Sequence, residues 1–195
     1  TVVLLLFSVV YFALVERVAL FFWKVKPEYC SIYDIAFWRR ERFWKLCAQP
    51  TVHRLVLGTP FKGTLWRLLG ARVGRRLYDD GGWLVEKNIV TIGDDVMLNT
   101  GSGVQCHSQE DYALKSEATT IGSGCTLGVA AFVHYGVTVG DGAVIAPDSV
   151  RMKGEEVPAH QHWGGNPAQE LTGAWTFTSA HRDTTTNVRV ASATG

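Results

Sequence analysis

The sequence carries little excess charge and few cysteines. Its 19 lysines and arginines nearly balance 18 aspartates and glutamates, which leaves a formal net charge of +1. So small an excess gives no electrostatic reason to expect a nucleic-acid partner. The four cysteines lack C-x-x-C spacing and any pattern typical of metal ligands. We therefore expect no metal site, and thiols that are buried or kept reduced in a cytoplasmic compartment.

The apolar start of the chain lacks an initiator methionine and a basic segment ahead of it, so it is a poor match to a signal peptide. Residues 1–23 are apolar except for Glu16 and Arg17. A helix that spans a bilayer needs about 20 apolar residues. The pattern predicts a transmembrane helix over 1–23, as part of a longer protein. A buried helix of a globular domain stays open as the alternative, because the two charges are costly inside a bilayer.

Basic and aromatic residues follow this stretch. The basic ones are Lys24, Lys26, Arg39, Arg40, Arg42 and Lys45. An excess of positive charge is typical of the cytoplasmic side of a membrane. Aromatic side chains lie between these residues, which favours an amphipathic helix at the membrane surface over 31–46. The alternative is a helix packed across the base of the next domain. Residues 61–69 predict another short helix, so we assign 24–69 to a juxtamembrane helical segment.

Residues 121–150 form five six-residue units, IGSGCT, LGVAAF, VHYGVT, VGDGAV and IAPDSV. An aliphatic residue opens each unit, and a residue no larger than valine stands at each fifth position. A period of six fits neither an α-helix nor an isolated strand. It fits a parallel β-helix, in which each coil stacks its aliphatic residues on the coil below. The sequence therefore predicts a mainly β fold over 70–170.

The repeat is interrupted once. Ile92, Leu98 and Val104 keep the six-residue interval, but the next aliphatic opener, Ile121, follows after 17 residues, one short of three units. The intervening stretch begins with polar and titratable residues. It predicts a loop that leaves the scaffold, and such loops often carry function. Residues 152–168 contain glycines and prolines that predict an exit turn. The polar stretch 171–195 predicts a disordered tail.

The repeat and the exit motif GGNPA (164–168) resemble the hexapeptide-repeat acyltransferases, which fold as left-handed parallel β-helices. A closer resemblance is to the C-terminal half of non-ribosomal peptide synthetases of the ε-poly-L-lysine synthetase type. The stretches that carry it are FWRRERFWKL (37–46), YDDGG (78–82), QCHSQED (105–111), AFVHYGVT (131–138) and MKGEEVP (152–158).

This resemblance implies the last acyltransferase-like domain of such an enzyme, after the last of several membrane helices. The implied reaction is condensation of amino acids through amide (isopeptide) bonds. The implied donor is an aminoacyl thioester on the 4′-phosphopantetheine of a thiolation domain, with no tightly bound cofactor. Related β-helix enzymes are trimers with sites between subunits, so sibling domains are expected to form a trimer or pseudo-trimer. The β-helix would then lie on the cytoplasmic side of an integral membrane protein.

His107 stands where the repeat breaks. The resemblance places a catalytic histidine at this point, and imidazole is the usual base for acyl transfer. We expect Glu110 and Asp111 to orient its ring or to bind a cationic substrate, with Glu117 adding negative charge. The alternative is a surface histidine in a mobile loop.

His134 breaks the pattern of its unit, because the other units have glycine or alanine at the second position. Such departures often mark functional positions. We expect it, with Tyr135, to bind substrate; a structural histidine at a subunit interface is the alternative. Asn99 is a candidate to bind the reacting carbonyl or amine, or else part of an asparagine ladder. The resemblance places three residues beside the pantetheine arm: Trp163, Gly165 and Asn166.

Two other functions stay open. In the first, the chain is a non-catalytic subunit that completes a pseudo-trimer around the site of another copy. In the second, it is a membrane-associated O- or N-acetyltransferase that uses acetyl-coenzyme A. His107 favours catalysis over the first of these alternatives.

Overall fold

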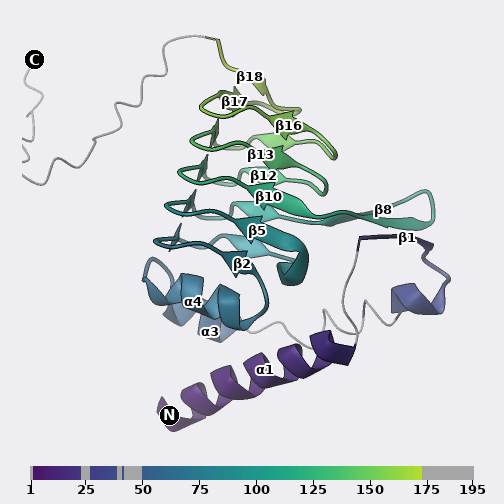
Figure 1. Ribbon diagram of the computed structural model, residues 1–195, viewed down its shortest axis with the longest axis vertical. Helices are drawn as coiled ribbons and strands as arrows, with labels where there is room; N and C mark the ends of the chain where they lie inside the picture. The colour runs from purple at the N-terminus through teal and green to yellow at the C-terminus, as the bar shows by residue number, and fades with distance from the viewer. Residues whose placement is uncertain (1, 23–26, 39–40, 42–49, 173–195) are drawn as a thin grey trace, which may run out of the picture.

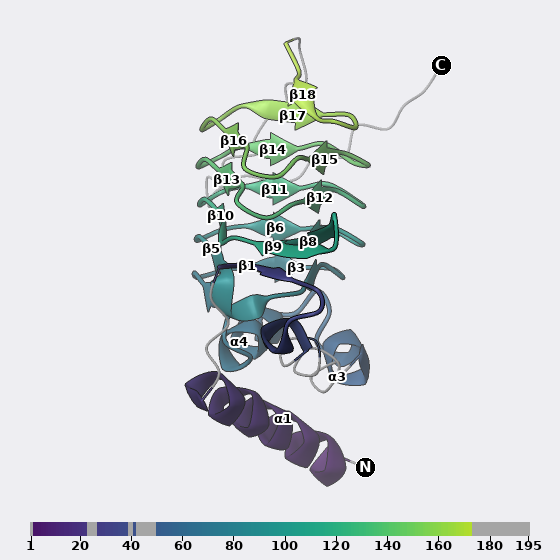
Figure 2. The same ribbon diagram turned by 90° about the vertical axis from the view of Figure 1, so that its right-hand side faces the viewer.

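The structure, a computed structural model, describes residues 2–22, 27–38, 41 and 50–172. Short parallel strands stack coil upon coil above helices α1 (Val2–Phe22), α3 (Pro50–Leu55) and α4 (Phe61–Leu68), as Figure 1 shows. An antiparallel arm extends from one side of the stack and points toward the viewer in Figure 2.

The coils form three parallel sheets, because each strand pairs with strands at the same place in the neighbouring coils. The first sheet contains β2 (Arg72–Val73), β5 (Val90–Ile92), β10 (Thr119–Ile121), β13 (Thr138–Val139) and β16 (Glu156–Val157). The second contains β3 (Tyr78–Asp79), β6 (Met97–Leu98), β11 (Thr126–Leu127), β14 (Val144–Ile145) and β17 (His162–Gly164), with β18 (Gln169–Glu170) added antiparallel. The third contains β4 (Trp83–Leu84), β7 (Gly103–Val104), β12 (Phe132–Val133) and β15 (Val150–Arg151). The predicted parallel β-helix is confirmed.

The aliphatic residues that open the six-residue units form the core. Ile121 lies in register with Ile92 in one neighbouring coil and with Val139 in the other, and all three are at most 2% exposed. The fifth positions of the units, which turn the corners, are fully buried: Cys125, Ala131, Val137, Ala143 and Ser149. Because the openers stack in register, the six-residue period produces a continuous buried column. Each aliphatic side chain buried in it contributes roughly 1.5–3 kcal/mol to the stability of the fold.

The segment predicted as an exit turn continues the coils. β16 and β17 pair in parallel with β13 and β14, so residues 152–164 form a further turn of the β-helix. The chain leaves only at β18, after the cis peptide bond between Asn166 and Pro167.

The interruption after Val104 is an arm rather than an irregular loop. β8 (His107–Glu110) and β9 (Ala113–Ser116) form an antiparallel hairpin, and β1 (Glu28–Ser31) adds a third strand beside β9. The Glu117 backbone N–H donates a hydrogen bond to the Cys106 carbonyl at 3.2 Å, which closes the neck of the arm before the chain re-enters the coils at β10.

Helices α3 and α4 close the base of the coils around a buried polar cluster. Trp66 Nε1 donates a hydrogen bond to Asp79 Oδ2 at 2.6 Å, and Lys62 Nζ lies 3.9 Å from the same oxygen. Lys62 Nζ also lies 3.1 Å from His53 Nδ1. Burial, with the Lys62 charge, lowers the pKa of His53 to about 4, so this ring is uncharged at neutral pH. The cluster satisfies charges that would otherwise be costly in the core.

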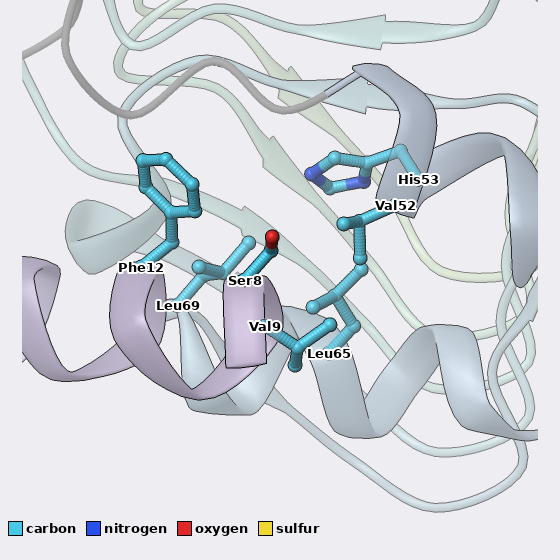
Figure 3. A pocket seen from close by; sticks show the side chains of 7 residues that line it. All are labelled: Ser8, Val9, Phe12, Val52, His53, Leu65 and Leu69. Carbon is cyan, nitrogen blue, oxygen red and sulfur yellow. The ribbon is translucent and has the colours of Figure 1, made fainter. Parts of the chain in front are cut away.

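Helix α1 packs on this base. Arg17 Nε and Nη2 donate hydrogen bonds to the Leu68 and Arg67 carbonyls, at 3.1 and 2.8 Å, at the end of α4 where carbonyls lack helical partners. Figure 3 shows the small cavity between the three helices, with the His53 ring directed into it. Its lining consists of Ser8, Val9, Phe12, Val52, His53, Leu65 and Leu69.

The predicted transmembrane helix is not supported. Residues 2–22 are helical, as the sequence predicts, but in the part of the chain that the structure describes no helix is long and apolar enough to cross a membrane. Helix α1 contacts the base of the β-helix on one side, where Arg17 binds the end of α4 and Val9 packs against the buried core, while other large apolar side chains of α1, such as Val3 and Leu6, are exposed.

Parts of two other predicted segments lie outside the described residues. In the predicted surface helix over 31–46, residues 35–38 and 41 are helical, whereas 39–40 and 42–46 are not described. Lys24 and Lys26 and residues 173–195 of the predicted tail also lie outside.

Candidate active site

A buried carboxylate holds the ring of His107, the first residue of the arm. Glu86 precedes the short 3-10 helix η1 (Lys87–Ile89), and its side chain is 0% exposed. Its Oε1 contacts His107 Nδ1, and its Oε2 accepts the Cys106 backbone N–H at 2.8 Å. A carboxylate at Nδ1 favours the tautomer with Nδ1–H, which leaves a lone pair on Nε2 of the neutral ring. The His107 side chain is 17% exposed, so this ring combines a fixed orientation with access to solvent.

Glu86 was not among the residues that the sequence predicted. The signal that identifies it is strand register: Leu84 lies beside Val104 in adjacent coils, and the same offset of 20 residues places Glu86 beside Cys106. This offset is known only once the pairing of β4 with β7 is known, because the chain from Leu84 to Val104 does not follow a strict six-residue period.

Glu110 and Asp111, predicted from the sequence to orient the His107 ring or to bind a cationic substrate, pair with lysines in the structure. β8 is extended, and at about 3.3 Å per residue its three steps carry Glu110 roughly 10 Å from His107. Glu110 instead pairs with Lys153, in the turn between β15 and β16, and lies 3.7 Å from Lys115. Asp111 lies in the hairpin turn, where its Oδ2 is 3.6 Å from Lys115 Nζ. The hydrogen bond from Lys153 lowers the pKa of Glu110, so this carboxylate is charged and ties the arm to a coil of the scaffold.

His134 lies close to His107 because its neighbour in the adjacent coil, Gln105, is two residues before His107. Val133 and Val104 are in register, so the residues that follow them, His134 and Gln105, are neighbours. His134 Nδ1 accepts the Tyr135 backbone N–H at 3.0 Å. Its ring meets the rings of Phe132 and Tyr135 edge-on, with centroids 5.4 and 5.0 Å apart. Burial, followed by the Lys153 charge, lowers the pKa of His134.

The other predicted residues occupy different places. Asn99 Nδ2 donates a hydrogen bond to the Leu127 carbonyl at 2.8 Å, so its amide joins two coils. Glu117 is exposed at the neck of the arm, and its carboxylate lies against Gly136. The structure thus gives Asn99 a scaffold contact and leaves Glu117 near the arm.

The residues predicted to bind pantetheine lie at the end of the coils. Trp163 belongs to β17 in the second sheet, and the Arg151 guanidinium stacks on its ring at 4.1 Å. The Gly165 N–H donates a hydrogen bond to Ser149 Oγ at 3.0 Å, and Asn166 is exposed. His107 and His134 follow strands of the third sheet instead. The structure therefore brings these two histidines together and places Asn99 and Trp163 at another sheet.

No protein-family model matches the chain. The chain is 31% identical, over 148 residues, to the Delta-poly-L-ornithine synthetase of Acinetobacter baumannii (strain AB307-0294). The match covers 74% of this chain and 11% of that protein, so the chain spans about a ninth of the length of this relative.

A maltose O-acetyltransferase of Clostridium difficile 630 has a similar solved structure, with a TM-score of 0.54 at 17% identity. The alignment covers 74% of this chain and 91% of that one. This chain therefore shares its fold with that acetyltransferase.

Proposed function

We propose that this chain transfers an acyl group from a thioester to an amine, with His107 as the general base and Glu86 as the residue that positions it. The contact between His107 Nδ1 and the buried Glu86 carboxylate is the observation that carries this proposal. Glu86 also accepts the Cys106 N–H at Oε2, which anchors its carboxylate beside the His107 ring. An oriented imidazole with a basic Nε2 is the group that acyl transfer requires.

The reaction follows from this geometry. His107 Nε2 takes a proton from the acceptor amine as the amine nitrogen attacks the thioester carbonyl carbon. The carbon–nitrogen bond forms, and the carbonyl oxygen becomes an oxyanion. The tetrahedral intermediate then collapses, the carbon–sulfur bond breaks, and the leaving thiolate receives the proton from the His107 imidazolium. The products are an amide and a free thiol, and the base is regenerated.

The donor in this proposal is an aminoacyl thioester on the 4′-phosphopantetheine arm of a thiolation domain, and the acceptor is the amine of an amino acid or short chain. The similarity to a protein named as a poly-L-ornithine synthetase supports an amino-acid polymer as the product. In the same proposal the chain works beside sibling acyltransferase-like domains, in a trimer or pseudo-trimer held at a membrane.

The test uses the chain with two donors, acetyl-coenzyme A and an ornithyl or lysyl thioester of pantetheine, and with free amino acids as acceptors. Thiol release and the mass of the amide product are measured. We expect transfer from the aminoacyl thioester, and a loss of roughly 10²–10⁴ in rate for His107→Ala. If the chain used only acetyl-coenzyme A as a donor, the proposal of an aminoacyl donor would be wrong and the donor would be an acetyl thioester. An unchanged rate in His107→Ala, at an unchanged melting temperature, would overturn the assignment of the base.

A further inference from the structure

The backbone carbonyl of His107 points away from the other strand of the hairpin. The Glu117 N–H donates to the Cys106 carbonyl at 3.2 Å, so Cys106 and Glu117 form a hydrogen-bonded pair at the neck of the arm. In an antiparallel ladder such pairs alternate with pairs that exchange no hydrogen bonds. His107 and Ser116 are the next pair along. The His107 carbonyl is therefore directed away from β9, and β8 lies at the edge of the arm sheet.

The side chain of Gln105 gives this carbonyl a hydrogen bond that the hairpin ladder does not supply. Gln105 Nε2 donates to the His107 carbonyl oxygen at 3.1 Å. The bond spans two residues of the chain, at the corner where the chain turns from β7 into the arm. It closes a ring made of the Gln105 side chain and the backbone up to His107. A side chain that binds its own neighbouring backbone in this way restricts the local backbone conformation.

Gln105 is itself held by the adjacent coil. Its backbone N–H donates to the Val133 carbonyl at 3.0 Å, and its own carbonyl is hydrogen-bonded to the His134 ring. Because His134 Nδ1 accepts the Tyr135 N–H at 3.0 Å, the single N–H of the neutral ring is on Nε2 and serves the Gln105 carbonyl. Burial lowers the pKa of His134, which keeps the ring in this neutral form at neutral pH. The contact gives a reason for a bulky ring where the other units have glycine or alanine.

From this arrangement we infer that Gln105 is a positioning residue for the proposed base, because its amide fixes the His107 backbone relative to the coil that contains His134. The inference rests on the proposed function, since it concerns the same base. β7, which leads into Gln105, lies between β4 and β12. Glu86 therefore holds the His107 ring from one neighbouring coil, and Gln105 ties the His107 backbone to the other. A reacting group displaced by about 1 Å can lose on the order of 10² in rate, so this bond bears on catalysis without touching substrate.

Gln105→Met tests the inference, because methionine has nearly the same size and no charge but lacks the donor. In the thioester assay we expect kcat to fall by roughly 10–10²-fold, with KM for thioester and amine within a few-fold of the parent. Nitrogen-15 NMR of the His107 imidazole should show a second tautomer beside the Nδ1–H form of the parent. The matched control is Gln109→Met, the same change two residues beyond His107, where Nε2 donates to Glu41 instead. Its kcat and its spectrum should match those of the parent.

The His107→Ala background separates positioning from a general structural role. There Gln105→Met should leave the residual rate within about twofold, because a residue that acts only through His107 has nothing left to act on. The same fold-loss in both backgrounds would overturn the inference, as would an unchanged kcat or an unchanged His107 tautomer in Gln105→Met. Melting temperatures accompany each measurement. If Gln105→Met does not fold, Gln105→Glu, which has the same shape and no donor at neutral pH, takes its place with the same expectations.

These outcomes are distinct from failure of the proposed function. An inactive parent chain, or a fully active His107→Ala variant, would reject the reaction itself. The tautomer of His107 in Gln105→Met would still test the link between Gln105 and the ring, because that measurement needs no turnover. An active parent whose rate depends on His107 leaves the Gln105 variants to decide this inference alone.

Discussion

At the scale of single residues, the candidate site depends on one buried carboxylate. Glu86 is 0% exposed and has two described partners, His107 Nδ1 and the Cys106 N–H. A carboxylate in such a position is costly to bury unless both oxygens are satisfied. The Cys106 N–H satisfies Oε2, and the contact of Oε1 with His107 Nδ1 makes the position of His107 depend on the coil that contains Glu86.

Replacing Glu86 by glutamine should lower kcat by as much as ~10⁴-fold, as when a carboxylate that holds a catalytic histidine becomes an amide. The amide can donate to Nδ1 and so favours the wrong tautomer of His107. Nitrogen-15 NMR of the imidazole reports the tautomer directly, independently of the rate. The matched control is Glu110→Gln, which removes a carboxylate from the arm; its rate should stay within a few-fold of the parent. If Glu110→Gln were the more damaging change, the positioning role would belong to the arm after all.

At the scale of elements, the arm is the hairpin of β8 and β9, extended by β1, and it leaves the coils at a hydrogen-bonded neck. Its neck is closed by the Glu117–Cys106 hydrogen bond, and Glu110 reaches across to Lys153. Gln109 Nε2 also donates to Glu41 Oε1 at 3.2 Å. Since exposed ion pairs contribute little to global stability, the Glu110–Lys153 pair is expected to affect the position of the arm rather than the stability of the fold.

This pair predicts a pH dependence of the arm. The hydrogen bond from Lys153 lowers the pKa of Glu110, so the stabilisation is present above the ordinary glutamate value of ~4.3 and is lost as the pH falls through the lowered value. Hydrogen exchange of the β8 and β9 amides, corrected for intrinsic rates, should show more protection in the parent than in Glu110→Gln at about pH 6, and no difference well below the lowered value. A difference that persists at the acidic end would mean that the charge of Glu110 is not what holds the arm.

At the scale of the whole molecule, the chain is a stack in which each coil contacts its neighbours. Such architectures distribute stability locally, because a change at one end is felt mainly by adjacent repeats. Helix α1 contacts the base through Arg17 and through the residues around the cavity in Figure 3, far along the stack from β16 and β17.

Arg17→Ala should therefore loosen α1 without disturbing the upper coils. The loss of hydrogen bonds to the end of α4 is expected to cost about 0.5–1.5 kcal/mol. Hydrogen exchange should become faster in α1 and at the end of α4, and stay unchanged in β13 and β14. Arg54→Ala, at an exposed position of α3, is the control and should leave both regions unchanged. Faster exchange throughout the coils would show that α1 stabilises the whole molecule.

The sequence by itself determined the scaffold. A six-residue period is a local rule, since each aliphatic opener meets the same position of the next coil, and the openers from Ile121 to Ile145 are buried accordingly. The break after Val104 likewise located the arm and His107, because an interruption is visible only against a regular pattern.

Only the tertiary structure decided which groups meet. Glu86 and His107 are 21 residues apart, and they are brought together by the register of β4 with β7 rather than by any local spacing. Glu110 and Asp111, close to His107 in sequence, are carried away because β8 is extended. The apolar stretch at the start satisfied a rule for membrane helices, yet the contacts of Arg17 and Val9 place α1 on the base of the β-helix. Composition and period specify what a segment can bury; the partners it buries against depend on how the coils stack.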